Sequence, residues 1–139
     1  MKFSYCLHEN ENPALDYLSE LLATGKHIVL LTGDLGAGKT TFVQHFLNRY
    51  FDEPVAVDSP TFSIVNSYDS GGTEVHHFDL YRLESPEEIE DIGFMEYIES
   101  GDLCFVEWPE KIAEFLPTER VVSLSISVSS SECRDYHFS

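Results

Sequence analysis

The stretch that decides the fold runs from residue 27 to residue 50: HIVLLTGDLGAGKTTFVQHFLNRY. Its first six residues, 27–32, form a short branched apolar run, which predicts a buried strand. Residues 33–38 are rich in glycine and predict a loop. Residues 39–50 carry apolar side chains at helical spacing, which predicts a helix with one buried face. The expected order is therefore strand, glycine-rich loop, helix.

The loop fits a phosphate-binding pattern at every fixed position. Gly33 to Thr40 matches G-x-x-x-x-G-K-[ST]. Glycines let the backbone approach phosphates because no Cβ intervenes, and successive N–H groups at a helix start form a nest for anions. Lys39 would contact the β- and γ-phosphates, Thr40 would contact Mg²⁺, and Thr41 would lie near the α-phosphate.

The sequence therefore predicts a site for a nucleoside triphosphate with Mg²⁺; the preference for ATP is implied by the family resemblance described below. The expected nucleotide-binding residues in this stretch are Asp34, Leu35, Gly36, Ala37, Gly38, Lys39, Thr40 and Thr41. The sequence contains no Asn-Lys-x-Asp motif, the pattern that reads guanine.

Two carboxylates are candidates for the second half of the site. Glu107 directly follows an apolar run at 103–106 that predicts a buried strand, and Asp79 lies at the end of another expected strand. P-loop enzymes hold Mg²⁺ with a carboxylate at the end of a neighbouring strand, directly or through water. One of the two could bind the metal and the other could orient the attacking water. The alternative for both is a solvated acid, since acidic residues are abundant in this chain.

Four further residues have both a functional and a structural interpretation. Thr61 could sense a γ-phosphate, as hydroxyls of switch loops do, or it could belong to a Ser-Pro turn. His76 and His77 are adjacent in an expected strand, so their side chains should face opposite sides and not share one metal. We interpret both as structural. Trp108 is either a core residue or an exposed anchor for a partner.

The charge of the chain limits its direct partners. It has 25 acidic and 8 basic residues, a net charge of −17. Proteins that grip nucleic acids cluster their lysines and arginines, but here these residues are scattered. Strong direct binding to nucleic acid is not expected. A basic partner protein suits this surface better, although an acidic surface more often just confers solubility.

Length and apolar pattern predict a single domain over residues 1–139. No apolar run approaches the ~20 residues of a membrane span, and no signal peptide is recognisable, so we expect a cytoplasmic protein. The chain has an odd number of cysteines, and none of them forms a C-x-x-C pair. They are Cys6, Cys104 and Cys133. They predict neither a disulfide framework nor a zinc site, but buried or incidental thiols.

Helical and strand patterns alternate along the chain, which predicts an α/β fold. We expect a three-layer P-loop NTPase-like fold with a mixed central sheet and flanking helices. Besides the stretch at 27–50, the expected helices are 13–23, one opening at Ser85 and a short one at 109–115; the expected strands are 62–68, 73–81, 103–106, 121–128 and one beginning at 136–138.

Four blocks of sequence resemble the TsaE family, also called YjeE, the small bacterial ATPases of the tRNA threonylcarbamoyladenosine pathway. The likeness extends over about residues 13–117, and the third and fourth blocks are specific to the family. The blocks are LTGDLGAGKTTF at 31–42, SPTFSIV at 59–65, HFDLYRL at 77–83 with PEE at 86–88, and VEWPE at 106–110.

The resemblance implies roles for particular residues. The family's P-loop lysine and threonine fall on Lys39 and Thr40, and its magnesium-binding glutamate falls on Glu107. Its functionally important aspartate and tryptophan fall on Asp79 and Trp108. The family's switch-like segment falls on residues 59–62, which include Thr61.

The two ends of the chain depart from the family pattern. Family members carry E-x-x-T near the base; here Glu11 keeps the acid, but Ala14 replaces the threonine. A glycine-arginine pair is usual late in the family, whereas here Arg134 is displaced from that place.

The resemblance also implies partners and an activity. The family works with TsaB and TsaD, which transfer the threonylcarbamoyl group to the adenosine at tRNA position 37, and its ATP hydrolysis supports turnover of that assembly.

Two other classes of function stay open from the residues alone. One is a small-molecule P-loop kinase, although the four arginines are not paired and no lid-sized insertion is visible. The other is a nucleotide-dependent binding module with negligible turnover.

Overall fold

The structure is a computed structural model that describes residues 1–51, 53–57 and 64–139. Its strands are β1 (Lys2–Cys6), β2 (Ile28–Thr32), β3 (Val65–Ser70), β4 (Thr73–Asp79), β5 (Leu103–Glu107), β6 (Val121–Val128) and β7 (Cys133–Phe138). Its helices are α1 (Pro13–Leu22), α2 (Lys39–Tyr50), α3 (Pro86–Asp91) and α4 (Phe94–Glu99), and short 3-10 turns span Pro109–Lys111, Ala113–Phe115 and Thr118–Arg120.

The strands form one mixed sheet in the order β1-β7-β6-β2-β5-β4-β3. β2 is parallel to both β5 and β6, and β4 is parallel to β5. β3 pairs antiparallel with β4 at one edge, while β7 and β1 continue the other side with antiparallel pairs. The predicted α/β class with a mixed central sheet is confirmed.

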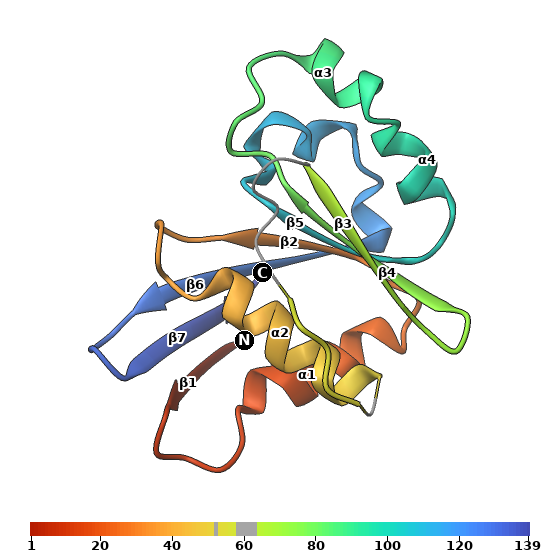
Figure 1. Cartoon of the computed structure of the whole chain (residues 1–139). Coiled ribbons are helices and arrows are strands. Elements are labelled where there is room, and N and C mark those ends of the chain that lie inside the picture. Colours follow the sequence, from red (N-terminus) through yellow and green to blue (C-terminus); the bar gives the residue numbers. More distant parts are fainter. Residues whose placement is uncertain (52, 58–63) are drawn as a thin grey trace.

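Helices cover both faces of the sheet, which gives three layers (Figure 1). Val29 and Leu31 of β2 pack in one core cluster with α1 and α2. Ile28 and Leu30 face the other way and pack in a second cluster with α3 and α4. Because β2 is buried on both faces, its sequence is continuously apolar and not alternating.

Elements with a strong local signal follow the sequence prediction closely. Helix α2 has the predicted bounds, and β6 alternates as expected, with Val122, Leu124 and Ile126 buried. The helix expected after Ser85 breaks at Gly93, whose φ of 70° separates α3 from α4. The expected helix at 109–115 is two 3-10 turns instead. Strand β1 was not predicted.

One prediction about the cysteines is wrong. Cys6 and Cys133 form a disulfide, and the two residues lie directly opposite each other where β1 pairs with β7. The two residues are 127 positions apart in sequence, and only the pairing of the two strands brings them into contact. Cys104 remains a free, buried thiol, as expected.

Within the part of the chain that the structure describes, no helix has the length and apolar character needed to cross a bilayer.

Candidate phosphate-binding site

The loop between β2 and α2 has backbone angles that require glycine. Gly38 is the residue before α2 and has φ of 105°, in the left-handed region that side chains disfavour. Gly33 has φ of 150°, and a Cβ built there would lie 2.5 Å from the backbone oxygen of Ile126 in β6. Both glycines are therefore needed for this bend to lie against the sheet.

Lys39 is held at the centre of the loop. Its Nζ donates to the backbone oxygen of Gly33 at 2.5 Å and lies 3.8 Å from the ring centroid of Trp108. Burial lowers the pKa of Lys39, and the charges of Glu107 and Asp79, among other carboxylates, oppose that shift. The Lys39 amine is thus confined between carboxylates and the indole face of Trp108. Phosphate oxygens could replace the Gly33 carbonyl as its hydrogen-bond acceptor.

Glu107 lies at the carboxyl end of β5 and is almost fully buried. Its Oε2 accepts a hydrogen bond from Thr40 Oγ1 at 3.0 Å and lies 2.5 Å from His77 Nε2. A buried carboxylate persists only when it has such partners. The P-loop hydroxyl and the carboxylate that the sequence pointed to are therefore brought into direct contact.

His77 is a site residue that the sequence interpretation treated as structural only. Its side chain is fully buried, and its Nδ1 has no hydrogen-bond partner within the described residues. His76 instead contacts Asp102, so the prediction that the two histidines face opposite sides is confirmed. The available signal was the spacing: His77 and Asp79 are two apart in a strand and share a face.

Asp79 and Trp108 lie beside this contact. Asp79 at the end of β4 is paired in register with Glu107, and its Oδ1 accepts from the backbone N–H of Tyr81 at 3.1 Å. Trp108 has φ of 58°, the left-handed region, which costs a residue with a side chain roughly 1–2 kcal/mol. This conformation follows β5 directly and places the partly buried indole over Lys39, packed against Tyr81.

A pocket of about 250 Å³ unites these groups. It is lined by Leu35, Gly36, Gly38, Lys39, Thr40, Thr41, Asp79, Glu107 and Trp108. Two other predicted loop residues lie around it: Asp34 is exposed, and the buried Ala37 donates its backbone N–H to the backbone oxygen of Asp34 at 3.0 Å.

Two adjoining pockets lead away from the loop. The first shares Gly38 and Thr41 with the loop pocket and is also lined by Arg134. The second shares Tyr5 and His45 with the first, has a volume of about 450 Å³ and contains Glu11. Glu11 is therefore two pockets away from Lys39.

Arg134 reaches the loop although the sequence pattern placed it out of position. Its Nε donates to the backbone oxygen of Ala37 at 2.9 Å, and its NH1 donates to the backbone oxygens of Ser130 and Cys133. The signal that sequence reasoning lacked is the strand β7, which carries Arg134 past the P-loop. Thr61, with the rest of the predicted switch segment at 59–62, lies outside the described residues.

A mixed sheet with parallel central strands, a glycine loop entering a helix, and a lysine and hydroxyl opposite a strand-end carboxylate define a P-loop protein of the α/β class. The family model described as "Threonylcarbamoyl adenosine biosynthesis protein TsaE" matches residues 9–136. The chain belongs to the TsaE family.

Individual relatives agree with this assignment. A protein of Rickettsia felis named tRNA threonylcarbamoyladenosine biosynthesis protein TsaE is 40% identical over 114 residues, which cover 80% of this chain and 66% of that protein. The protein of the same name from Bacillus subtilis is 39% identical over 115 residues, 83% of this chain and 71% of the relative. Some matches span less of the relative, 58% for the protein from Rickettsia conorii.

A solved structure shares the fold. The crystal structure of Bacillus subtilis YdiB matches with a TM-score of 0.66 and 29% sequence identity, over 99% of this chain and 84% of that one.

Proposed function

We propose that this chain binds ATP with Mg²⁺ and hydrolyses it, as a subunit of the bacterial machinery that makes threonylcarbamoyladenosine in tRNA. In this proposal its turnover supports the action of TsaB and TsaD partners. The observation that carries it is the contact of Thr40 Oγ1 with Glu107 Oε2 at 3.0 Å, beside the confined amine of Lys39.

Phosphate binding follows from the loop. Backbone N–H groups of the loop and of the start of α2, apart from that of Ala37, which donates to Asp34, would offer donors to a polyphosphate. Lys39 would exchange its bond to the Gly33 carbonyl for one to the β- and γ-phosphates. Burial lowers the pKa of Lys39, and its neighbouring carboxylates partly offset that effect by favouring the positive charge.

The donor set fits Mg²⁺, which prefers oxygen ligands and binds through one or two protein groups plus phosphates. Thr40 and Glu107 would hold the ion, directly or through water. When bound, Mg²⁺ neutralises charge on the β- and γ-phosphate oxygens. His77 acts as a positioning residue in this scheme, because it fixes one oxygen of Glu107 from the buried side.

The remaining predicted residues would surround the γ-phosphate and the base. Asp79 is the candidate to orient the attacking water, since it lines the same pocket as Lys39 and Glu107. Trp108 would sense occupancy of the loop through its contact with Lys39 and pass it to a partner, and Thr61 would sense the γ-phosphate. Glu11 and Arg134 line the two adjoining pockets and would face the nucleoside.

The pathway assignment rests on the family and on the charge. Named relatives across several bacteria are called biosynthesis proteins of this tRNA modification. Of the 25 acidic residues, eleven besides the buried Glu107 lie between residues 84 and 119, where the only basic residue is Lys111. A surface of this kind favours basic protein partners over a direct grip on tRNA.

The test measures phosphate release from ATP by the chain alone and with purified TsaB and TsaD. We expect slow release alone and faster release with the partners. Glu107→Gln should lower the stimulated rate by at least about 100-fold, the loss typical when one group that supports charge stabilisation in the transition state is removed, while metal-free nucleotide still binds. Glu20→Gln, at an exposed glutamate of α1 outside the acidic stretch 84–119, is the matched control.

Other outcomes would contradict the proposal. A phosphorylated acceptor in place of free phosphate would identify a kinase. Nucleotide-dependent binding of partners without phosphate release would identify a binding module. Equal losses of hydrolysis and of metal-free nucleotide binding in Glu107→Gln would point to a folding defect at this position.

A further inference from the structure

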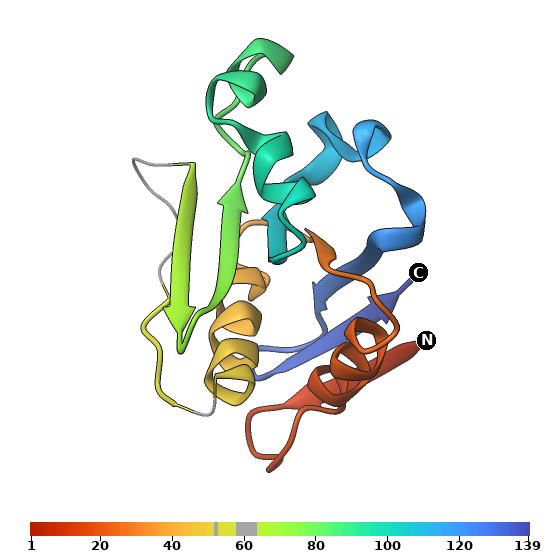
Figure 2. The same cartoon turned by 90° about the vertical axis from the view of Figure 1, so that its right-hand side faces the viewer.

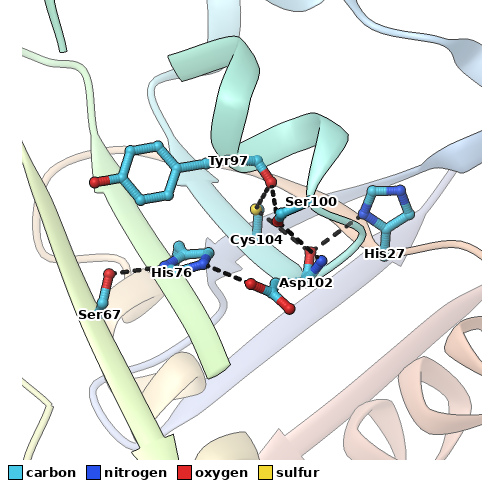
Figure 3. A network of polar contacts seen from close by, with 7 residues as sticks. All are labelled: His27, Ser67, His76, Tyr97, Ser100, Asp102 and Cys104. Carbon is cyan, nitrogen blue, oxygen red and sulfur yellow. Dashed lines mark hydrogen bonds and ion pairs between the residues drawn. The ribbon is translucent and has the colours of Figure 1, made fainter. Parts of the chain in front are cut away.

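A second polar cluster lies away from the P-loop, on the face of the sheet covered by α4 (Figure 3). His76 of β4 is at its centre. Its Nδ1 lies 2.7 Å from Ser67 Oγ of β3, and its Nε2 lies 3.0 Å from Asp102 Oδ2, just before β5. Glu74, two residues earlier on β4, faces the same side. One ligand atom each of Glu74, His76 and Asp102 lies within 4.8 Å of the others.

This cluster is separate from the site described above. Glu74 is near the start of β4, whereas Asp79 ends that strand, a distance of roughly 16 Å along an extended chain. His76 packs against Tyr97 of α4, with ring centroids 4.7 Å apart, and so points away from Glu107. No role in nucleotide binding follows from this position.

The hydrogen bond between His76 Nδ1 and Ser67 Oγ fixes the imidazole ring so that Nε2 faces the carboxylate of Asp102. When Nδ1–H donates to Ser67 Oγ, the Nε2 atom presents a lone pair toward the carboxylates of Asp102 and Glu74. A lone pair and two carboxylates repel one another unless a proton or a metal cation lies among them. A histidine whose other nitrogen is fixed by a hydroxyl also has the arrangement usual for a metal ligand with an outer-shell partner.

We propose that Glu74, His76 and Asp102 bind one divalent transition-metal ion of the Zn²⁺ type. One imidazole nitrogen with two carboxylate oxygens suits zinc and its neighbours. Magnesium and calcium favour sites made of oxygen alone. Three protein ligands leave a fourth position for water.

The side chains have the freedom that binding needs. Ligands of a tetrahedral zinc lie roughly 3.4 Å apart, given metal–ligand distances of about 2.0–2.2 Å, so the cluster must contract slightly. His76 is 6% exposed and stays in place, while Asp102 is 33% exposed and Glu74 is exposed. The two carboxylates therefore move toward a fixed imidazole.

Binding would tie three separate segments together. The backbone of Asp102 is held in the loop before β5 by two contacts. Its carbonyl oxygen lies 3.2 Å from His27 Nδ1, and its N–H donates to Ser100 Oγ at 3.2 Å. Glu74 and His76 belong to the β3–β4 hairpin at the sheet edge. The metal would link that hairpin to the loop between α4 and β5.

The experiment uses full-length, tag-free protein treated with a chelator and then dialysed. Zn²⁺ is titrated against a competing chromophoric chelator, and Co²⁺ is added separately to record visible absorption bands. We expect one ion per chain and a rise in melting temperature on adding zinc. Glu74→Gln, Asp102→Asn and His76→Gln should each weaken zinc binding by at least about tenfold.

Three controls keep the test decisive. His137→Gln removes an exposed histidine on β7 and should bind zinc like the unaltered chain. Glu107→Gln should also retain the site, which separates it from the P-loop. Because Glu74 is exposed, Glu74→Gln should melt like the unaltered chain without metal and lose only the zinc-induced rise.

The proposal is overturned if the unaltered chain binds no zinc at micromolar free ion. It is also overturned if zinc binds but none of the three ligand variants weakens it. In either case His76 is a hydrogen-bond link between Ser67 and Asp102 and nothing more.

Discussion

Lys39 shows how one buried residue is held ready for a ligand. Its amine has two fixed neighbours, the carbonyl of Gly33 and the face of Trp108. Neither is an anion, although carboxylates of Glu107 and Asp79 are near enough to raise its pKa against burial. A triphosphate would supply the paired charge that this position lacks.

Lys39→Ala should therefore lose at least about 100-fold in ATP affinity, since charged hydrogen bonds to the β- and γ-phosphates contribute about 1.5–3 kcal/mol each and tenfold is about 1.4 kcal/mol. Isothermal titration calorimetry measures this directly. Lys2→Ala, at an exposed lysine on β1, is the control and should bind normally. An unchanged affinity in Lys39→Ala would remove the basis of the nucleotide site.

Cys104 provides a prediction about pH. Burial, and to a smaller extent the charge of Asp102, raises the pKa of the Cys104 thiol from 9.0 to about 12. The unfolded chain ionises this thiol above pH 9 while the folded chain does not. Folding stability should therefore fall as pH rises from 9 toward 12, by roughly 1.4 kcal/mol per pH unit from this group.

Urea unfolding at pH 7 and pH 10.5 measures the effect. Other groups titrate in that range, so the comparison is with Cys104→Ala, whose stability should fall less over the same interval. Equal pH dependence in the two proteins would mean that this thiol ionises as easily in the fold as outside it.

Among the elements, α1 begins with a well-defined cap. Asn12 is 4% exposed, and its Oδ1 accepts from the backbone N–H of Ala14 at 3.0 Å, ahead of Pro13 at the first helical position. The cap satisfies a donor that a helix start leaves without an intrahelical partner. Helix α1 packs in the same core cluster as β6 and β7, so its start affects that side of the sheet.

Asn12→Ala should lower the free energy of unfolding by about 1–2 kcal/mol. The midpoint of urea denaturation measures the loss, and Asn10→Ala, an exposed asparagine in the same loop, should change it little. If Asn12→Ala and Asn10→Ala lower the urea midpoint equally, the loop before α1, and not the Asn12 cap, is the stabilising feature.

At the scale of the whole molecule, the two ends of the chain lie side by side (Figure 2). The backbones of Met1 and Phe138 exchange hydrogen bonds, and β1 pairs with β7 along its length. The Cys6–Cys133 disulfide crosses this pair at the end nearer Arg134, which contacts the P-loop. The edge of the sheet and the nucleotide pocket are thus connected.

Reducing the disulfide should lower stability by about 2–5 kcal/mol, because the bond closes most of the chain into one loop and restricts the unfolded state. Urea unfolding with and without dithiothreitol measures this change. The double variant Cys6→Ser with Cys133→Ser should be as unstable as the reduced protein and insensitive to the reductant. If dithiothreitol leaves the midpoint of the unaltered protein unchanged, the bond is not present in solution.

The sequence by itself determined the strand, loop and helix at 27–50, because glycine spacing, apolar run and helical period are local signals. It also pointed to Glu107 and Asp79 at strand ends, although it could not place Thr40 against Glu107, which depends on the parallel pairing of β2 with β5. Tertiary structure alone decided the disulfide, the reach of Arg134 and the partner of His77. Each joins residues at least 30 positions apart, and no local pattern encodes such contacts.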